Sequence, residues 1–557
     1  MKILNIVRSL KVFSLHSQKS QPFAKRGLFL DAPLRVFCCT ALSESEELKE
    51  FMEYMEKLKN YEKIGVPRGA GTDSGDGFDL GRMRRLLQYL GNPQSKFKAV
   101  HIAGTKGKGS TAAFLSSILR AQGYPVGCYT SPHIRTIRER ITLGTAGEPV
   151  SLKALSSHFH RIKENLDMAV KLEKGHLSHY EVFTALAFSL FAEEKVQFAV
   201  VEAGLGGARD ATNVLSNSDL AVSVITNIGA EHLAALGGSL ETVAVAKSGI
   251  IKERRPLILG GPFFPHIERI IRDKAMSMSS PVVSASDPGN KSVVKGFSRT
   301  REMPHQLCDI LLLMQRDIHM FIELFDVQLH LLGSHQLQNA ATATCAALCV
   351  RDQGWNLSDA SIRAGLESAY LLGRSQFLTS KEAEMLGLTG ANILLDGAHT
   401  KESAQALVNM IKTIFSDSRL VLVVAMANDK DRLGFARVLL SAQCLEAVCL
   451  TETDIAGDRT RTTSSSSLKD IWIQACRYNG GDFIDCKTAK YELIQDQHTQ
   501  SAEKNGCRPV LFVESSLMGS LRFGNEILAA KCRNQHGMIV VTGSLHIVSA
   551  VLGLVEG

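Results

Sequence analysis

The 557-residue sequence has no uninterrupted apolar run of the roughly 18–20 residues that a membrane-spanning helix needs. Its twelve cysteines include no Cys-x-x-Cys pair, so the spacing favours neither a disulfide scaffold nor a zinc site. Cys345 and Cys349 come closest, on an Ala-rich stretch typical of a buried helix, and we interpret them as buried free thiols. We therefore expect a folded chain from a reducing compartment, with no membrane partner.

Beyond the first 40 residues, the sequence has almost no excess of positive over negative charge. Residues 1–40 contain seven basic residues and one acid, Asp31, and so hold +6 of the total net charge of +7. The remaining +1 gives no body-wide positive charge, and no nucleic-acid partner is expected. The first 40 residues are Ser-rich and mix bases with apolar residues, which is typical of an organelle transit peptide. We predict targeting to the mitochondrial matrix; a plastid address or a basic tail without a targeting role are the alternatives.

Short apolar runs alternate with helical stretches along the remainder of the chain. This alternation predicts a mainly parallel sheet covered by helices on both faces, and residues 331–350 read as one of the helices. Residues 278–323 interrupt the rhythm and suggest an insertion or a short antiparallel piece. The predicted strands lie at residues 99–103, 198–203, 220–226 and 257–260, then at 393–395, 420–424, 447–450, 510–513 and 538–541.

Two separate series of strands indicate two α/β domains rather than the four that length alone would permit. After the transit peptide at residues 1–40, we predict a larger domain at 45–370 and a smaller one at 374–557.

A glycine-rich segment between a predicted strand and a predicted helix is the strongest functional signal. Backbone N–H groups of such a turn curl around phosphate, the helix N-terminus favours anions, and Lys108 adds a point charge. The spacing differs from the ordinary phosphate loop because Gly109 replaces the hydroxyl residue after Lys108. A tight turn without a ligand is the alternative to nucleotide binding. The predicted ATP-binding loop comprises Gly104, Thr105, Lys106, Gly107, Lys108, Gly109 and Ser110.

Glu202 ends an apolar strand and is followed by a second glycine-rich turn at residues 204–207. In a parallel sheet the carboxyl end of a strand faces the ligand crevice, where a carboxylate is a natural ligand for Mg²⁺. A helix cap is the alternative reading of Glu202.

A series of motifs from about Asp79 to the C-terminus, taken together and in order, resembles the folylpolyglutamate synthase/dihydrofolate synthase family, whose members are relatives of the Mur ligases. The motifs are the loop at 104–110, Thr130-Ser131-Pro132-His133, Arg138-Glu139-Arg140-Ile141, residues 202–207 with Asp210-Ala211-Thr212-Asn213, Glu231-His232, Ala246-Lys247-Ser248-Gly249-Ile250, Gly333-Ser334-His335-Gln336 with Asn339-Ala340, and Asp396-Gly397-Ala398-His399.

This resemblance implies an ATP-dependent amide ligase of the Mur ligase type. The expected fold is a P-loop NTPase-like, parallel-sheet ATPase domain followed by a smaller Rossmann-like α/β domain. The expected chemistry transfers the γ-phosphate of ATP to a pterin-linked carboxylate, and the amine of L-glutamate then opens the acyl phosphate. The implied cofactors are ATP and Mg²⁺, with a requirement for K⁺ left open, and we expect a monomer.

The resemblance also assigns metal ligands. Ser131 and Glu202 would hold one Mg²⁺, and His232 with Lys247 would serve a second. An ammonium group has no lone pair for a metal, but the matching lysine of the family is carbamylated, which turns the cation into a carboxylate. Without that modification, Lys247 would contact phosphate directly. The catalytic residues expected on this basis are Lys108, His232 and Lys247.

The nucleotide and pterin contacts are likewise carried over by resemblance. Asn339 and Arg374 match nucleotide-contacting positions, while Asp396 and His399 would reach the nucleotide from the second domain. Asp396 could also serve as a helix N-cap. For Tyr180, a position in the hydrophobic core is the alternative to stacking on the pterin. The residues expected to bind the pterin substrate are Asp79, Leu80, Gly81, Ser178, His179, Tyr180, Glu181, Arg209, Asp210 and Ala211.

Several positions depart from the family pattern. Lys106 stands where Asn is common, Ala208 where a basic residue is common, and Ala246 where Glu is common. Arg209, one position on, is expected to replace the charge missing at Ala208. Thr400-Lys401 stands in place of Asn-Pro, which removes a helix-starting proline.

Three functions are compatible with these motifs. The first is dihydrofolate synthase, which joins dihydropteroate to a first glutamate. The second is folylpolyglutamate synthase, which adds further glutamates to a folate, and an enzyme that does both is a variant of this second reading. The 178–181 segment and the Gly-Ala-Arg-Asp run at 207–210 look more like the monofunctional dihydrofolate synthases of plant organelles, so we predict that activity. A phosphate-loop switch that hydrolyses nucleotide without ligation is the third reading, and the pairing of His232 with Lys247 argues against it.

Overall fold

The computed structural model describes residues 46–72, 78–298, 304–315, 317–455, 457, 459–486, 508–531 and 537–556. The transit peptide predicted for residues 1–40 lies outside this set. No helix within these ranges has both the length and the apolar character needed to cross a bilayer.

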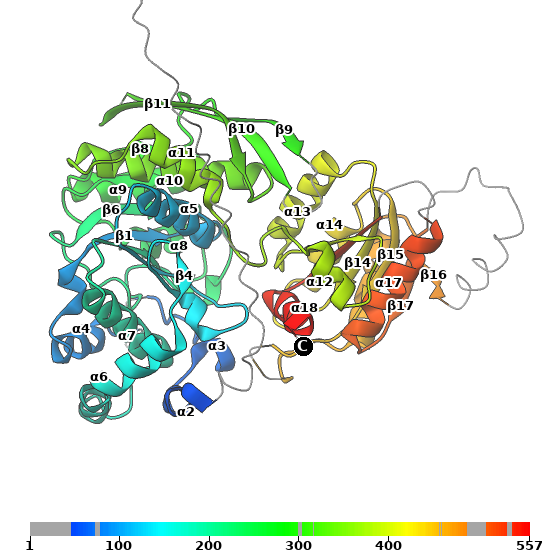
Figure 1. Ribbon diagram of the computed structural model, residues 1–557, viewed down its shortest axis with the longest axis horizontal. Helices are drawn as coiled ribbons and strands as arrows, with labels where there is room; N and C mark the ends of the chain where they lie inside the picture. Colours follow the sequence, from blue (N-terminus) through cyan, green and yellow to red (C-terminus); the bar gives the residue numbers. More distant parts are fainter. Residues whose placement is uncertain are drawn as a thin grey trace, which may run out of the picture. The chain divides into compact units, whose positions relative to one another are not determined.

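The first sheet carries the predicted phosphate loop. Its strand order is β4-β3-β2-β5-β1-β6-β7-β8, and the six strands from β2 to β8 run parallel while β3 and β4 form an antiparallel edge (Figure 1). Because β1 lies between β5 and β6, the loops that follow these three strands share one edge of the sheet. The strands are β1 (Lys98–Ala103), β2 (Val126–Tyr129), β3 (Ile141–Leu143), β4 (Glu148–Pro149), β5 (Phe198–Glu202), β6 (Leu220–Ile225), β7 (Leu257–Leu259) and β8 (Val282–Ser284).

Helices cover this sheet on both faces. One layer contains α5, α10 and α11, and the other contains α4, α6 and α7. The helices are α2 (Lys49–Glu56), α3 (Tyr61–Ile64), α4 (Leu80–Tyr89), η1 (Pro93–Lys96), α5 (Lys108–Ala121), η2 (Ile137–Arg140), α6 (Leu152–Leu172), α7 (His179–Glu193), η3 (Leu233–Leu236), α8 (Leu240–Ser248), α9 (Pro265–Ser277), α10 (Ser334–Asp352) and α11 (Asp359–Ser368).

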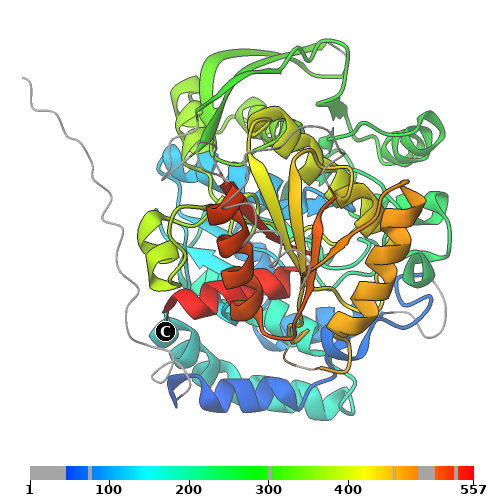
Figure 2. The same ribbon diagram turned by 90° about the vertical axis from the view of Figure 1, so that its right-hand side faces the viewer.

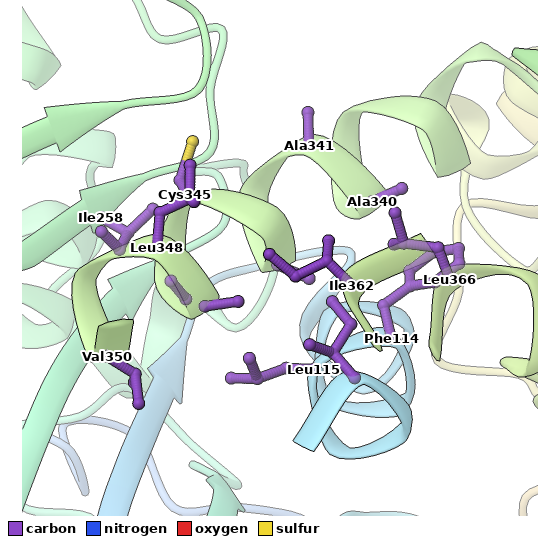
Figure 3. Close-up of a cluster of buried hydrophobic side chains, with 14 of the residues drawn as sticks. Phe114, Leu115, Ile258, Ala340, Ala341, Cys345, Leu348, Val350, Ile362 and Leu366 are labelled. Atoms are coloured by element: carbon purple, nitrogen blue, oxygen red, sulfur yellow. The ribbon is translucent and has the colours of Figure 1, made fainter. Parts of the chain in front are cut away.

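Figure 3 shows the apolar packing between α5, α10 and α11. Phe114 and Leu115 of α5 face Ile362 and Leu366 of α11, and all four side chains are fully buried. Alanines of α10 let this helix approach α5 closely, and Cys345 and Cys349 of α10 are free thiols buried in the same apolar cluster. The rigid packing fixes the start of α5, and therefore the phosphate loop, relative to the sheet.

A small antiparallel sheet of order β11-β10-β9 occupies the region where the sequence loses its alternating rhythm. The prediction of an antiparallel piece within residues 278–323 is therefore confirmed. Its strands are β9 (Val293–Ser298), β10 (His305–Gln315) and β11 (His319–Leu329).

A third sheet is built from the C-terminal part of the chain (Figure 2). Its order is β12-β13-β18-β14-β15-β17-β16, with β12 antiparallel at one edge and the remaining strands parallel. Its elements are β12 (Gln376–Phe377), α12 (Ser380–Met385), β13 (Asn392–Leu395), α13 (Lys401–Ile414), β14 (Arg419–Val424), α14 (Arg432–Leu439), β15 (Leu445–Leu450), α15 (Ser465–Tyr478), β16 (Ile484–Asp485), β17 (Val510–Val513), α17 (Leu517–Lys531), β18 (Gly537–Thr542) and α18 (Leu545–Glu556).

All nine predicted strands are present, and the α/β class with two mainly parallel sheets is confirmed. The helix predicted at 331–350 is α10. Helix α13 begins at Lys401 without the proline that the family pattern would supply, because the Thr400 side chain accepts a hydrogen bond from the Ser403 N–H and caps the helix.

Candidate functional site

The glycine-rich loop joins β1 to α5, as the strand–loop–helix pattern predicts. Gly107 has a φ of 82° and precedes Lys108, the first residue of the helix. A Cβ at Gly107 would lie 2.4 Å from Asn339 Oδ1, so only glycine lets α10 approach the loop this closely. Thr226, which follows β6, donates a hydrogen bond to the Lys106 carbonyl at 2.6 Å and holds the loop from the other side. The N-terminus of α5 is thereby presented to an anion.

Glu202 ends β5 beside this loop and is 4% exposed. Its Oε1 lies 3.7 Å from Lys108 Nζ, and its Oε2 accepts a hydrogen bond from the Ser131 N–H at 3.3 Å. Burial raises the pKa of Glu202, and the nearby Lys108 charge opposes that rise. No helix begins at Glu202, so the helix-cap reading is wrong. A carboxylate, a hydroxyl-bearing residue and a lysine therefore meet at the carboxyl edge of the sheet.

Lys247 occupies the last turn of α8 and is 5% exposed. Its Nζ donates a hydrogen bond of 2.7 Å to the carbonyl of Gly104, so the amine touches the start of the phosphate loop. Burial, and then the charge of Lys108, lowers the pKa of Lys247 to about 7. A substantial fraction of the amine is therefore uncharged at neutral pH, which is unusual for lysine and is the state that reacts with electrophiles.

His232 precedes the short helix η3 and has a left-handed backbone with a φ of 56°. The residue is exposed over part of its surface, yet desolvation of the imidazole by the surrounding protein lowers its pKa. The positive charges of Lys430, Lys108 and Lys247 lower it further. The imidazole is consequently neutral near pH 7 and keeps a lone pair for a ligand.

The neighbouring Glu231 forms an ion pair with Lys106, and its Oε1 lies 3.6 Å from His399 Nε2. Burial disfavours ionisation of Glu231, but His399 and Lys106 outweigh this effect and hold its pKa well below the usual range. Lys106, the residue that replaces the family's common Asn, therefore has a carboxylate partner in this chain.

Asp396 follows β13 and organises the loop that carries Arg374. Its Oδ2 accepts a hydrogen bond from the Ser375 N–H at 2.9 Å, and its Oδ1 accepts one from the Ala398 N–H at 2.9 Å. Thr400, not Asp396, caps the next helix, so the N-cap reading of Asp396 is wrong.

The segments expected to contact pterin come together around Arg209. Its Nη1 donates a hydrogen bond of 2.9 Å to the Phe78 carbonyl, directly before the segment Asp79, Leu80 and Gly81. Asp79 itself caps α4 by accepting a hydrogen bond from the Gly81 N–H at 2.7 Å. The structure thus places two segments distant in sequence next to each other.

The start of α7 has a structural role that explains part of its sequence. Ser178 and Glu181 form a reciprocal capping box, in which Glu181 Oε2 accepts the Ser178 N–H at 2.8 Å. His179 is buried and stacks on Phe183, with ring centroids 6.3 Å apart. Tyr180 packs against the buried cluster of this layer, so its core reading has support. The Tyr180 hydroxyl is buried without a hydrogen-bond partner among the described residues.

Asp210 is 2% exposed and directs its carboxylate into its own loop. Oδ2 accepts a hydrogen bond from the Leu205 N–H at 2.7 Å, while Oδ1 accepts one from the Thr212 N–H at 3.0 Å. Asp210 therefore shapes the turn that begins after Glu202 and displays its neighbours Arg209 and Ala211.

Comparison with known proteins identifies the family. The family model described as the Mur ligase middle domain matches residues 102–347. A dihydrofolate synthase/folylpolyglutamate synthase of Bacillus subtilis is 34% identical over 360 residues, covering 63% of this chain and 76% of that protein. This chain belongs to the folylpolyglutamate synthase/dihydrofolate synthase family.

Two further relatives extend this picture. The human protein named folylpolyglutamate synthase, mitochondrial, is 28% identical over 558 residues, covering 86% of this chain and 89% of that protein. The crystal structure of a Mycobacterium tuberculosis folylpolyglutamate synthase, described as complexed with ADP and AMPPCP, superposes with a TM-score of 0.70 at 23% identity and covers 92% of this chain and 99% of that one. The Mur ligase fold predicted from the sequence is therefore confirmed.

The family membership gives a reason to test these residues as metal ligands. Within the described parts of the chain, no cluster of three or more His, Cys, Asp or Glu side chains has metal-binding geometry. The donor set is instead mixed: the carboxylate of Glu202 and the hydroxyl of Ser131 are oxygen donors of the kind Mg²⁺ prefers, and His232 is neutral. Unmodified Lys247 does not fit a metal, whereas a carbamate on its uncharged amine does.

Two residues near this cluster received no role from the sequence. Glu231 pairs with Lys106, and Lys430 lies close enough to His232 to lower its pKa. Lys430 lies in the polar run 428–431, which begins after three apolar residues beyond the end of β14, so a search of the loops that follow the strands would have found it.

Proposed function

We propose that the chain is a dihydrofolate synthase, which uses ATP and Mg²⁺ to join L-glutamate to 7,8-dihydropteroate. The observation that carries the proposal is the convergence of Lys108, Glu202 and Lys247 on one glycine-rich loop. We further propose an ATP-binding domain at 45–370 and a second ligase domain at 374–557, with the chain acting as a monomer.

The first step needs two anions to approach each other. The carboxylate of dihydropteroate attacks the γ-phosphorus of ATP, the bond to the β,γ-bridging oxygen breaks, and ADP leaves. Lys108 lies at the N-terminus of α5, where its ammonium and the loop N–H groups offset the charge that accumulates on the phosphates. Ser131 and Glu202 would hold Mg²⁺, which would offset more of that charge.

The second step forms the amide. The uncharged amine of glutamate attacks the acyl carbon, phosphate departs, and the nitrogen loses a proton. Arg374 and Asp396 lie on adjoining loops, and with Asn339 and His399 they would contact the nucleotide. Excluding water here protects the acyl phosphate from hydrolysis.

Lys247 would act as a carbamate. Its amine reacts with CO₂ to give N–COO⁻ and one released proton, and the new carboxylate would complete a second metal site with His232. The support for this role is the burial of the Lys247 amine and its pKa of about 7, because only an uncharged amine attacks CO₂.

Dihydropteroate would bind beside Arg209, which holds the Asp79, Leu80 and Gly81 segment against the loop that contains Asp210 and Ala211. Ser178, His179, Tyr180 and Glu181 form the neighbouring helix start and would line the same site.

An acceptor comparison tests this assignment. Purified protein with ATP, Mg²⁺ and glutamate is expected to form product from dihydropteroate in preference to tetrahydrofolate. Product from tetrahydrofolate alone would identify a folylpolyglutamate synthase, and product from both a bifunctional enzyme. ADP release that does not depend on glutamate would support a nucleotide switch instead, and repeating the assay with added K⁺ tests a monovalent-ion requirement.

We also propose that residues 1–40 direct the chain to the mitochondrial matrix. A fusion of the full chain to a fluorescent protein is expected to enter mitochondria, whereas a chain beginning at residue 41 is expected to stay in the cytosol with unchanged kcat. Unaltered location of the shortened chain would contradict a targeting role, and accumulation of the full chain in plastids would reassign the organelle.

A further inference from the structure

Asn213 lies in the loop between β5 and β6 and is 5% exposed, and its side-chain amide is fully engaged. Its Nδ2 donates hydrogen bonds to the carbonyls of Ala208 and Gly249, both at 3.0 Å. Its Oδ1 accepts a hydrogen bond of 2.8 Å from Lys252 Nζ. Both amide hydrogens therefore join two backbone segments that are 41 residues apart.

The orientation of the Asn213 amide follows from its neighbours. The ammonium of Lys252 can only donate, so the oxygen of Asn213 must face it. The NH₂ group then has to face the two carbonyls, which can only accept. Because all three partners fit the same orientation of the amide, Lys252 and the two carbonyls together fix the direction in which Asn213 donates.

The two segments that Asn213 joins carry residues with proposed roles in substrate binding and in catalysis. Ala208 precedes Arg209, and Gly249 follows the turn of α8 that carries Lys247. The Ala208 N–H also donates to the Ala246 carbonyl at 2.7 Å. A Cβ at Gly249 would lie 2.3 Å from the Ala208 Cβ, so the two backbones are in direct contact.

We propose that Asn213 is a positioning residue that holds the Lys247 turn and the Arg209 loop in one fixed relation. The inference rests on the proposed ligase function, in which Arg209 lies beside the acceptor and Lys247 beside the transferring phosphate. Lys252 acts with Asn213 by orienting its amide. Since a displacement of about 1 Å between reacting groups costs on the order of 10² in rate, loss of this connection should affect turnover more than folding.

The variant Asn213→Asp tests the connection with almost no change in shape. It keeps an oxygen for Lys252 but places a second oxygen against the two carbonyls in place of the donors. We expect kcat to fall by about 10²-fold and KM for dihydropteroate to rise by about tenfold, with KM for ATP within about twofold of the wild-type value. Thermal unfolding of each variant reports whether the fold is intact.

Ser223→Ala is the matched control. Ser223 is fully buried in β6, and its hydroxyl donates a hydrogen bond of 3.0 Å to the Ile250 carbonyl, one residue beyond Gly249. This hydrogen bond connects the segment after α8 to strand β6 of the sheet, and it does not involve the Arg209 loop. Its loss should reduce stability but leave kcat and both KM values within about threefold of the wild type.

A second variant, Lys252→Met, keeps Asn213 but removes one of the three groups that orient it, and leaves Asn213 Oδ1 without its donor. We expect kcat and KM to change in the same direction as in Asn213→Asp, with kcat reduced by about three- to tenfold. If Asn213→Asp does not fold, the kinetic constants of Lys252→Met test the positioning role instead. Kinetic constants that match those of Ser223→Ala in both variants would overturn the positioning role. If the wild-type enzyme uses tetrahydrofolate and not dihydropteroate, the substrate assignment fails, and the same ratios measured with tetrahydrofolate still decide the role of Asn213.

Discussion

Lys247→Ala is expected to lower kcat by about 10³-fold or more while the protein stays folded. The loss follows from the position of the amine, 2.7 Å from the Gly104 carbonyl at the start of the phosphate loop. A carbamate there, together with His232, would hold a second Mg²⁺, which would offset the negative charge of the phosphates and contribute several kcal/mol to stabilising the transition state. Steady-state turnover with saturating ATP and glutamate measures the effect.

The fold should tolerate this change for a physical reason. Burial disfavours the Lys247 ammonium, as its lowered pKa shows, so removing the group relieves a desolvation cost. What is lost is one hydrogen bond to Gly104, which is worth about 1 kcal/mol. Thermal unfolding should therefore shift by only a few degrees. Lys274→Ala, on the exposed side of α9, is the control and should keep wild-type turnover.

The carbamate itself is directly observable. With ¹³C-labelled bicarbonate, the wild-type protein should give a carbamate resonance that Lys247→Ala lacks. Because the reaction consumes an uncharged amine and releases a proton, the signal should grow as the pH rises through about 7 and weaken below it. Added formate or acetate should restore part of the turnover of Lys247→Ala, since a small carboxylate can replace the missing one. Full turnover without the resonance would contradict the carbamate.

Sequence reasoning reached the elements of the site because its signals are local. A strand followed by glycines and a helix predicts an anion-binding turn, and Glu202 at the end of an apolar strand predicts a polar group at the crevice. Both rules depend on a few neighbouring residues, and the structure places Lys108 and Glu202 3.7 Å apart at the carboxyl edge of the parallel sheet. The parallel strands themselves follow from the alternation of apolar runs with helical stretches.

Other features depend on contacts between distant segments. Nothing in the sequence around Lys106 indicates that Glu231 is its partner, because 125 residues separate the two. Asn213 belongs to a recognisable motif, but its hydrogen bond to Gly249 exists only once α8 packs against the loop. The reading of Ser178 and Glu181 as substrate contacts also passed over a local signal, the S-x-x-E pattern of a capping box.

Glu202→Gln is expected to reduce kcat by about 10³-fold and to raise the Mg²⁺ concentration needed for half-maximal rate by at least tenfold. The amide keeps the size of the side chain but removes the negative charge that attracts a divalent cation. It also leaves Lys108 without the carboxylate that lies 3.7 Å away, so the lysine charge is no longer balanced before the nucleotide binds. Magnesium titrations of the initial rate at saturating ATP measure both effects.

Glu446→Gln is the matched control because Glu446 is also a buried strand carboxylate with cationic partners. It is 1% exposed in β15, and its Oε2 lies 2.8 Å from Lys531 Nζ. Glu446 is the second residue of its strand, at the amino end, whereas Glu202 is the last residue of β5. If position at the carboxyl end of a parallel strand determines function, Glu446→Gln should cost roughly 3–5 kcal/mol of stability and leave the magnesium dependence unchanged. A Glu202→Gln enzyme with wild-type magnesium dependence would remove Glu202 from the metal site.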